Sequence, residues 1–167
     1  AEVVERISVE FSVDARLLLI LLEYQSAWLT TVELSDDAKI YPIQGRISED
    51  GVDRSGLYKQ LAWAANQLNR GYYGWKYNGT TTLELKDGTR LRYADGLNAG
   101  TVGIQYFFSL QYDYLIWSQA INREGFYRIY TMYFGDPFIN AVDLLVPTNI
   151  QQPELTLPFS QGETWLF

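Results

Sequence analysis

The chain has 167 residues, of which 47% are hydrophobic and 20% charged, a composition that fits one globular domain with its own core. Its 13 basic and 20 acidic residues give a formal charge of −7, which argues against nucleic acid as a partner because phosphate binding needs an excess of cations. The chain contains neither cysteine nor histidine, so disulfides, thiolate chemistry, the commonest metal ligand and the commonest general base are all excluded. We therefore expect no metal and no cofactor.

The apolar and aromatic residues narrow the class of protein further. The longest apolar run, Leu17 to Leu22, is far shorter than the roughly 20 residues needed to cross a bilayer, so we expect no membrane insertion. Aromatic residues make up 16% of the chain, with 13 tyrosines and 5 tryptophans. Such residues either fill a core or line a groove for flat, hydroxylated ligands such as sugars, and the composition leaves both uses open.

The first predicted element is a helix over residues 13–28, with Ser12 and Asp14 supplying an N-cap and first turn. Its sequence, VDARLLLILLEYQSAW, is apolar on all sides, which predicts a central helix buried on most of its surface. Residues 30–54 are polar and interrupted by proline and glycine, and they predict a long loop with little regular structure.

A second helix and a hairpin follow this loop. The helix is predicted to begin after an N-cap at Ser55, to carry leucine and alanine on one face, and to end at Gly71. Beyond its end the sequence TTLELKDGTRLRY alternates on both sides of Asp87 and Gly88, the strongest short signal for a β-hairpin.

Three further helical stretches are predicted from Asn98 onward, in NAGTVGIQYFFSLQ, YDYLIWSQAIN and EGFYRIYTMYFG. Four of the five prolines fall in the last 31 residues, which predicts an extended arm there. The expected fold class is therefore α+β and mainly α, with a helical domain over residues 1–136, one β-hairpin within it, and an extended C-terminal arm over residues 137–167.

Glu23 is a candidate for catalysis because it lies at the polar end of the apolar first helix. Burial there would raise the pKa of its carboxyl group, so that it could hold a proton near neutral pH and donate it to a glycosidic oxygen. A glutamate near a helix end also commonly faces water or pairs with a cation, and its position in the sequence leaves both possibilities open.

The helix sequence VDARLLLILLEYQSAW resembles the first core helix of the lysozyme-like superfamily, particularly of soluble lytic transglycosylases and goose-type lysozymes. In those families a similar run ends in the catalytic glutamate followed by a serine. Downstream, NAGTVGIQYFF is similar to their G-A-x-G-L-M-Q motif, although one residue shorter, and the resemblance covers roughly residues 12–122. It implies a lysozyme-like arrangement with a sugar-binding groove. The position before Ser26 is Gln25, an amide that cannot donate a proton as a carboxylic acid does, which argues against catalysis.

The last stretch, LPFSQGETWLF, resembles the opening strand of lysostaphin-like zinc endopeptidases of the LasA and LytM kind, which often begin L-P-F-x-x-G-x-x-W. The zinc ligands of that family, two histidines and an aspartate, lie beyond this point. Because the chain has no histidine, it cannot itself be that peptidase. The resemblance implies a domain that precedes a covalently linked cell-wall peptidase, located outside the cell or in the cell envelope.

These observations predict a non-catalytic domain that binds or positions peptidoglycan, or another glycan, for a bacterial cell-wall endopeptidase. Two alternatives stay open: an active glycan hydrolase or lytic transglycosylase that uses Glu23 as general acid, and a structural spacer or pro-domain without a ligand. In the predicted groove, aromatic faces stack on sugars and amides bond hydroxyl groups. The residues assigned to this groove are Tyr24, Gln25, Trp28, Tyr72, Tyr73, Trp75 and Gln105.

Overall fold

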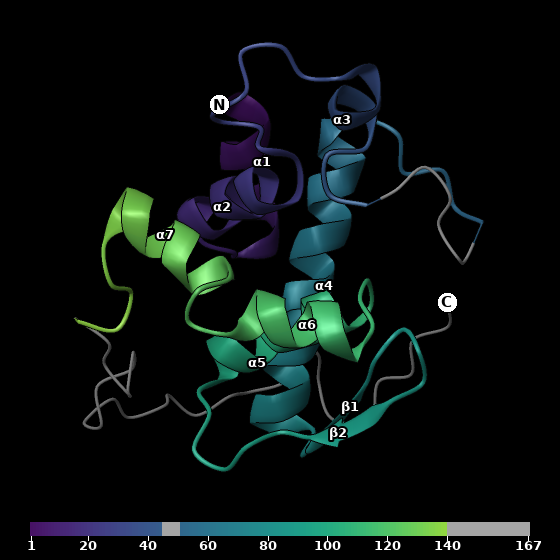
Figure 1. Ribbon diagram of the computed structural model, residues 1–167, viewed down its shortest axis with the longest axis vertical. Helices are drawn as coiled ribbons and strands as arrows, with labels where there is room; N and C mark the ends of the chain where they lie inside the picture. The colour runs from purple at the N-terminus through teal and green to yellow at the C-terminus, as the bar shows by residue number, and fades with distance from the viewer. Residues whose placement is uncertain (45–50, 140–167) are drawn as a thin grey trace, which may run out of the picture. The chain divides into compact units, whose positions relative to one another are not determined.

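The computed structural model describes residues 1–44 and 51–139. It divides the chain into two compact units, Ala1–Pro137 and Phe138–Phe167, and every described helix and strand belongs to the first unit (Figure 1). The predicted extended arm over residues 137–167 lies almost entirely outside the described residues, so its conformation stays a prediction.

The first unit is mainly helical with one two-stranded antiparallel sheet, which confirms the predicted fold class. The elements in chain order are α1 (Glu2–Phe11), α2 (Ala15–Ser26), α3 (Asp36–Ile40), α4 (Leu57–Tyr77), β1 (Thr82–Glu84), β2 (Arg90–Arg92), α5 (Ala99–Ser109), α6 (Tyr114–Ile121) and α7 (Phe126–Phe134).

Helix α2 is the predicted apolar helix. The Asp14 carboxylate caps it by accepting the backbone N–H of Arg16 at 2.8 Å, and Arg16 is its only exposed residue. The helix therefore packs against neighbours on nearly every side, as its sequence predicts. Helix α5 is buried to a similar extent, with Gly100 as its only exposed residue.

Helix α1, which precedes α2, was not predicted from the sequence. Val4 and Ile7 are buried on the side of α1 that packs against α4, at the spacing of one helical turn. Ser12 is not an N-cap of the next helix: it adopts a left-handed conformation (φ 53°) and ends α1, while the N–H of Val13 donates to the Ser8 carbonyl at 3.1 Å.

The predicted loop over residues 30–54 contains the short helix α3, and its residues 45–50 lie outside the described part of the chain. The Ser35 hydroxyl caps α3 by accepting the N–H of Ala38 at 3.2 Å, and Asp36 and Asp37 occupy the first turn, where carboxylates are favourable. The Ser35 cap and the acidic first turn therefore stabilise this short helix within an otherwise irregular segment.

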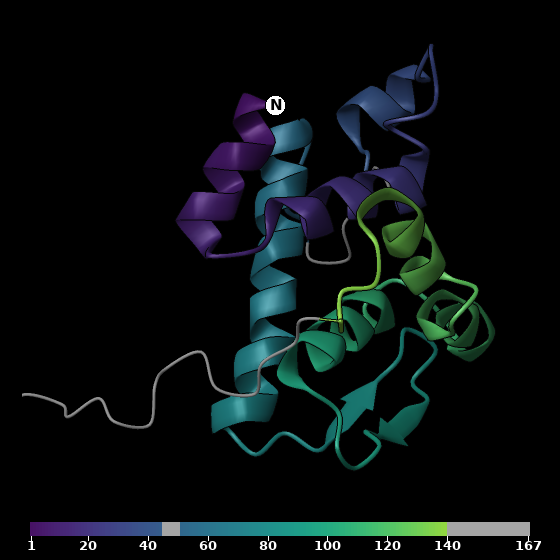
Figure 2. The ribbon, with the colours of Figure 1, turned by 90° about the vertical axis from the view of Figure 1, so that its left-hand side faces the viewer.

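Helix α4 corrects two predicted boundaries. Its N-cap is Gly56 rather than Ser55, and it continues through Gly71 to Tyr77. Gly71 does not end the helix because it serves a tertiary contact: a Cβ atom there would lie 2.7 Å from Tyr106 Cβ and 2.8 Å from Gly103 Cα. The glycine allows α5 to pack closely against the C-terminal half of α4, and Figure 2 shows this arrangement.

The predicted hairpin is confirmed. β1 and β2 pair antiparallel with Leu83 opposite Leu91, and Leu83 is buried. In the turn, Gly88 has a φ of 82°, and the Asp87 carboxylate accepts the N–H groups of Thr89 at 2.9 Å and Tyr114 at 3.1 Å. The turn is therefore tied directly to the start of α6.

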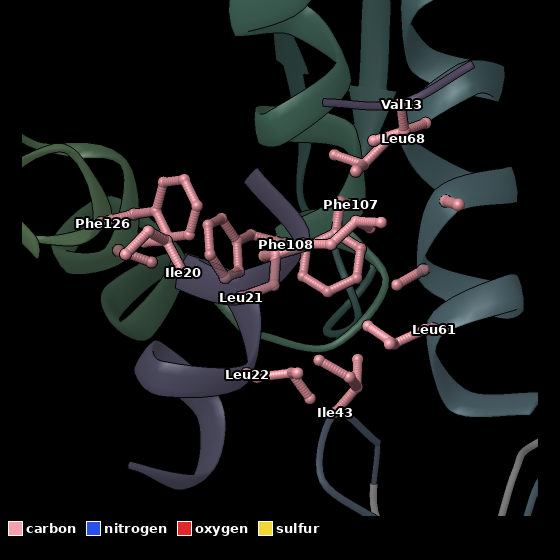
Figure 3. Close-up of a cluster of buried hydrophobic side chains, with 14 of the residues drawn as sticks. Val13, Ile20, Leu21, Leu22, Ile43, Leu61, Leu68, Phe107, Phe108 and Phe126 are labelled. Carbon is pink, nitrogen blue, oxygen red and sulfur yellow. The ribbon is translucent and has the colours of Figure 1, made fainter. Parts of the chain in front are cut away.

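The core lies between α2, α4, α5 and α7 (Figure 3). Phe108 from α5 meets Phe126 from α7 with ring centroids 5.5 Å apart, and Phe107 packs toward α4. At one end of the core, Leu22 and Ile43 point toward each other, which anchors the segment after α3 against α2.

A polar and aromatic cavity beside helix α4

A cavity of about 960 Å³ lies along α4. Its other walls come from the C-terminal end of α2, the end of α5 with the residues that follow it, the hairpin, and described residues on either side of the 45–50 gap. Its volume is at the upper end of the range typical of small-ligand sites. The lining residues outside α4 include Phe11, Gln25, Ile43, Gln44, Asp53, Arg54, Lys86, Tyr106, Leu110, Gln111 and Tyr112.

Helix α4 supplies one complete wall of the cavity. The lining residues on its face recur every three or four positions, so they form one stripe along the helix. From Lys59 to Arg70 the stripe is about 16 Å long at the helical rise per residue. Its members are Lys59, Ala62, Trp63, Asn66, Gln67 and Arg70, and Tyr58 in the first turn of α4 also lines the cavity.

Gln67 is the most deeply buried polar side chain of this stripe, with 5% of its surface exposed. Its amide forms no hydrogen bond to another residue, and neither amide atom is sealed from solvent, so the group faces the cavity. Because buried polar groups are normally hydrogen-bonded, an amide in this position indicates a polar ligand site.

Gln25 lines the opposite wall at the end of α2. Its Oε1 accepts the Tyr112 hydroxyl at 2.7 Å, and its Nε2 donates to Gln111 Oε1 at 3.4 Å. Burial raises the pKa of Tyr112 to about 12, so this hydroxyl remains a donor at physiological pH. Beside this pair, Gln111 Nε2 and Gln44 Oε1 are buried without a hydrogen-bond partner.

Gln60 holds the segment after α3 in place along the cavity. It is 1% exposed, its Oε1 accepts the N–H groups of Ile43 at 3.1 Å and Gln44 at 2.7 Å, and its Nε2 donates to the Arg54 carbonyl at 2.9 Å. One buried amide therefore fixes the described chain on both sides of the 45–50 gap to α4, and thereby positions Gln44 in the cavity wall.

Glu23 does not line the cavity. Its carboxylate accepts the N–H of Leu29 at 2.7 Å, both the N–H and the hydroxyl of Thr30 at 3.2 and 2.6 Å, and the Tyr133 hydroxyl at 3.4 Å. Desolvation raises the pKa of Glu23, but these hydrogen bonds together outweigh it, and the pKa lies below its ordinary value. A general acid needs the opposite shift, so the structure favours a structural role in which Glu23 fixes the turn after α2.

Of the other predicted groove residues, none lines this cavity. Tyr24 packs against Phe108 and Phe126, with ring centroids 5.3 and 5.8 Å away, and Trp28 packs against the core. These two aromatic residues therefore contribute to core packing.

The four remaining residues of the predicted groove lie on α4 and α5. Tyr72 borders a separate cavity of about 150 Å³, and the exposed Tyr73 stacks on Tyr77. The remaining two take part in contacts of the fold: the Trp75 ring meets Tyr93 edge-on, and the Gln105 carbonyl accepts an indole N–H. The structure thus brings only Gln25 of the predicted set to the large cavity.

The cavity wall formed by α4 was not predicted from the sequence. Its leucine and alanine face was recognised, but the polar stripe with Trp63, Asn66, Gln67 and Arg70 was not considered, because the polar face of an amphipathic helix ordinarily faces water. The available signal was the tryptophan and the two neighbouring amides within this face.

The described residues show neither a metal site nor a membrane span. No group of three acidic, histidine or cysteine residues there could hold a metal ion, and no described helix has the length and apolar character to cross a membrane. What the fold and the site define is a mainly helical domain with a ligand-sized polar and aromatic cavity.

The family model of the LasA N-terminal domain matches residues 1–149. The chain therefore belongs to the LasA N-terminal domain family, which agrees with the association with LasA-type peptidases inferred from its last residues. The chain matches no curated protein and no solved structure, so its likeness to lysozymes stays a prediction.

Proposed function

We propose that this domain binds glycan strands of peptidoglycan in the cavity beside α4, without cleaving them, and thereby positions a LasA-type cell-wall peptidase outside the cell. The observation that carries the proposal is the placement of Gln25. It lies in the cavity wall with its amide held by Tyr112 and Gln111. The sequence resemblance aligns this position with the catalytic acid of the glycan-cleaving families.

The chemistry of the walls fits a saccharide. Sugar rings offer apolar faces for aromatic contact and hydroxyl groups that both donate and accept hydrogen bonds. Trp63 and Tyr106 provide aromatic surface, and side-chain amides at three positions provide donors and acceptors. These amides belong to Gln25, Asn66 and Gln67.

The described residues of these walls lack the pair of carboxyl groups that glycoside hydrolysis generally needs. Among the described lining residues the only carboxylate belongs to Asp53, which accepts the N–H and hydroxyl of Ser55 at 2.9 and 3.1 Å and pairs with Lys59 at 3.2 Å. The hydrogen bond that Asp53 accepts from the Ser55 N–H is the largest of the causes that lower the pKa of its carboxyl group, so Asp53 stays ionised. Glycosidases generally need a protonated carboxyl group beside a second carboxylate.

A sedimentation assay with insoluble peptidoglycan sacculi tests the proposal. The domain should pellet with sacculi, and the Gln67→Leu variant should bind several-fold more weakly, because a lost hydrogen bond costs about 1 kcal/mol. The matched control is Gln105→Leu. Gln105 is a half-buried residue on α5, its side chain also ends in an amide, and it does not line the cavity. Binding of sacculi by this variant should therefore be unchanged.

The alternatives predict different outcomes in the same assay. A spacer or pro-domain would neither bind nor cleave sacculi. An active hydrolase would lower the turbidity of the suspension, and if Glu23 were its acid, the Glu23→Gln variant would abolish that loss. Sedimentation without loss of turbidity is the result we expect.

A further inference from the structure

We propose that the cavity recognises a carboxylate group on its ligand through Arg70 and Gln67, so that acidic saccharides are preferred over neutral ones of equal length. This inference rests on the proposed function and specifies the ligand class of the same site. In peptidoglycan strands the N-acetylmuramic acid sugars carry such a carboxylate wherever the stem peptide has been removed, whereas chitin-like strands carry none.

The charged residues of the cavity wall favour an anionic ligand. The chain as a whole carries −7, yet the described lining residues include four cations and a single carboxylate. The carboxylate of Asp53 already pairs with Lys59 at 3.2 Å. Two more of the described cations, Arg54 and Lys86, also take part in interactions within the protein, so Arg70 is the described cation of the wall that is available to an anionic ligand. The other cations of the wall are Arg54, Arg70 and Lys86.

The Arg70 guanidinium has no partner within the described part of the protein. Five other described arginines form ion pairs with a carboxylate of this chain, whereas Arg70 has no ion pair and no hydrogen bond. Its guanidinium presents several N–H donors in a planar arrangement that matches the two oxygens of a carboxylate. Among the described cations of this wall, Arg70 is the one that can bind a carboxylate without first giving up a partner within the protein.

The buried amide of Gln67 offers a second hydrogen-bonding group beside Arg70. Gln67, three residues before Arg70 on α4, is 95% buried and directs an unpartnered amide into the cavity. Side chains three positions apart on a helix are neighbours, so the amide and the guanidinium can donate to the same ligand group. Trp63, a further helical turn away on the stripe, offers an aromatic surface for the attached sugar ring.

Isothermal titration calorimetry with two soluble probes tests the inference. One probe is a tetrasaccharide of N-acetylglucosamine alone, and the other alternates N-acetylglucosamine with N-acetylmuramic acid. We expect the acidic probe to bind about tenfold more tightly, as one charge-assisted contact allows. Arg70→Gln should remove most of this preference, and Arg70→Lys, which keeps the charge, should retain part of it.

The matched control is Arg123→Gln. Arg123 is likewise exposed and forms no ion pair or hydrogen bond, but it lies outside the cavity, so its loss should leave the preference unchanged. Equal affinities for the two probes would overturn the carboxylate assignment and leave glycan binding intact. Equal weakening of both probes by Arg70→Gln would overturn it as well. Failure of both probes to bind the wild-type chain would overturn the proposed function together with the inference.

Discussion

The close contact between α4 and α5 gives the clearest quantitative prediction, the effect of Gly71→Ala. The added Cβ atom would lie 2.7 Å from Tyr106 Cβ, 2.8 Å from Gly103 Cα and 3.1 Å from the Val102 carbonyl oxygen. Ordinary carbon contacts are about 3.5 to 4.0 Å, so the two helices would have to separate by close to 1 Å. None of these atoms can move away by rotating a side chain.

Two opposing terms set the magnitude. Alanine is favoured over glycine within a helix by about 1 kcal/mol, whereas overpacking a core typically costs about 1–3 kcal/mol. Because the obstacles to Gly71→Ala are backbone and Cβ atoms, the cost lies at or above the upper end of that range, and we expect a net loss of about 2 kcal/mol in the free energy of unfolding. Tyr106 lines the cavity, so glycan binding should weaken as well.

Urea denaturation measures the effect, with Gly74→Ala as the matched control in the same helix. There the nearest atom to an added Cβ is the Thr80 hydroxyl oxygen, 3.3 Å away on a side chain that can rotate. We expect this control to gain up to about 1 kcal/mol from helix propensity. If Gly71→Ala proved as stable as the wild type, the close packing of α4 on α5 would not exist in solution.

Three further predictions concern buried or bonded polar groups. Gln60→Leu leaves the N–H groups of residues 43–44 without their acceptor, and the free energy of unfolding should fall by about 2–4 kcal/mol; an unchanged urea midpoint would contradict the anchoring role. The folded pKa of Glu23 lies below its unfolded value of about 4.3, so its contribution to stability is present above that pH and is lost as pH falls through the folded pKa. Glu23→Gln should therefore flatten the acid side of the stability profile, and an equally steep profile would refute this. Tyr112→Phe removes the hydrogen bond to Gln25 and should cost about 1 kcal/mol in urea unfolding, with no loss if that bond is absent in solution.

Elements that depend on local signals could be predicted from the sequence. The apolar run of α2, the Asp87–Gly88 turn and the Asn98 cap of α5 each act within a few residues. Gly71 shows where this reasoning fails. A glycine can end a helix or permit a close approach of two helices, and only the contact with Gly103 decides between these uses.

The cavity was only partly predictable for a similar reason. Gln25 was found because a family resemblance drew attention to its position. The wall formed by α4 has the sequence of a water-facing helix surface, and it becomes part of a cavity only because the segment held by Gln60 and the end of α5 lie opposite. Those partners are distant in the sequence, so no local pattern connects them.

Glu23 and Gln25 lie two positions apart on α2 and have different surroundings. Two positions along a helix rotate a side chain by about 200°, so the two cannot face the same site. Glu23 is bound by the turn at Leu29 and Thr30, whereas Gln25 faces Tyr112 in the cavity. The carboxylate at position 23 therefore fixes the chain after the helix, whereas a carboxylate introduced at position 25 would lie in the cavity wall. Under the proposed function, binding of a glycan without its hydrolysis depends on Gln25 having an amide instead of a carboxylic acid.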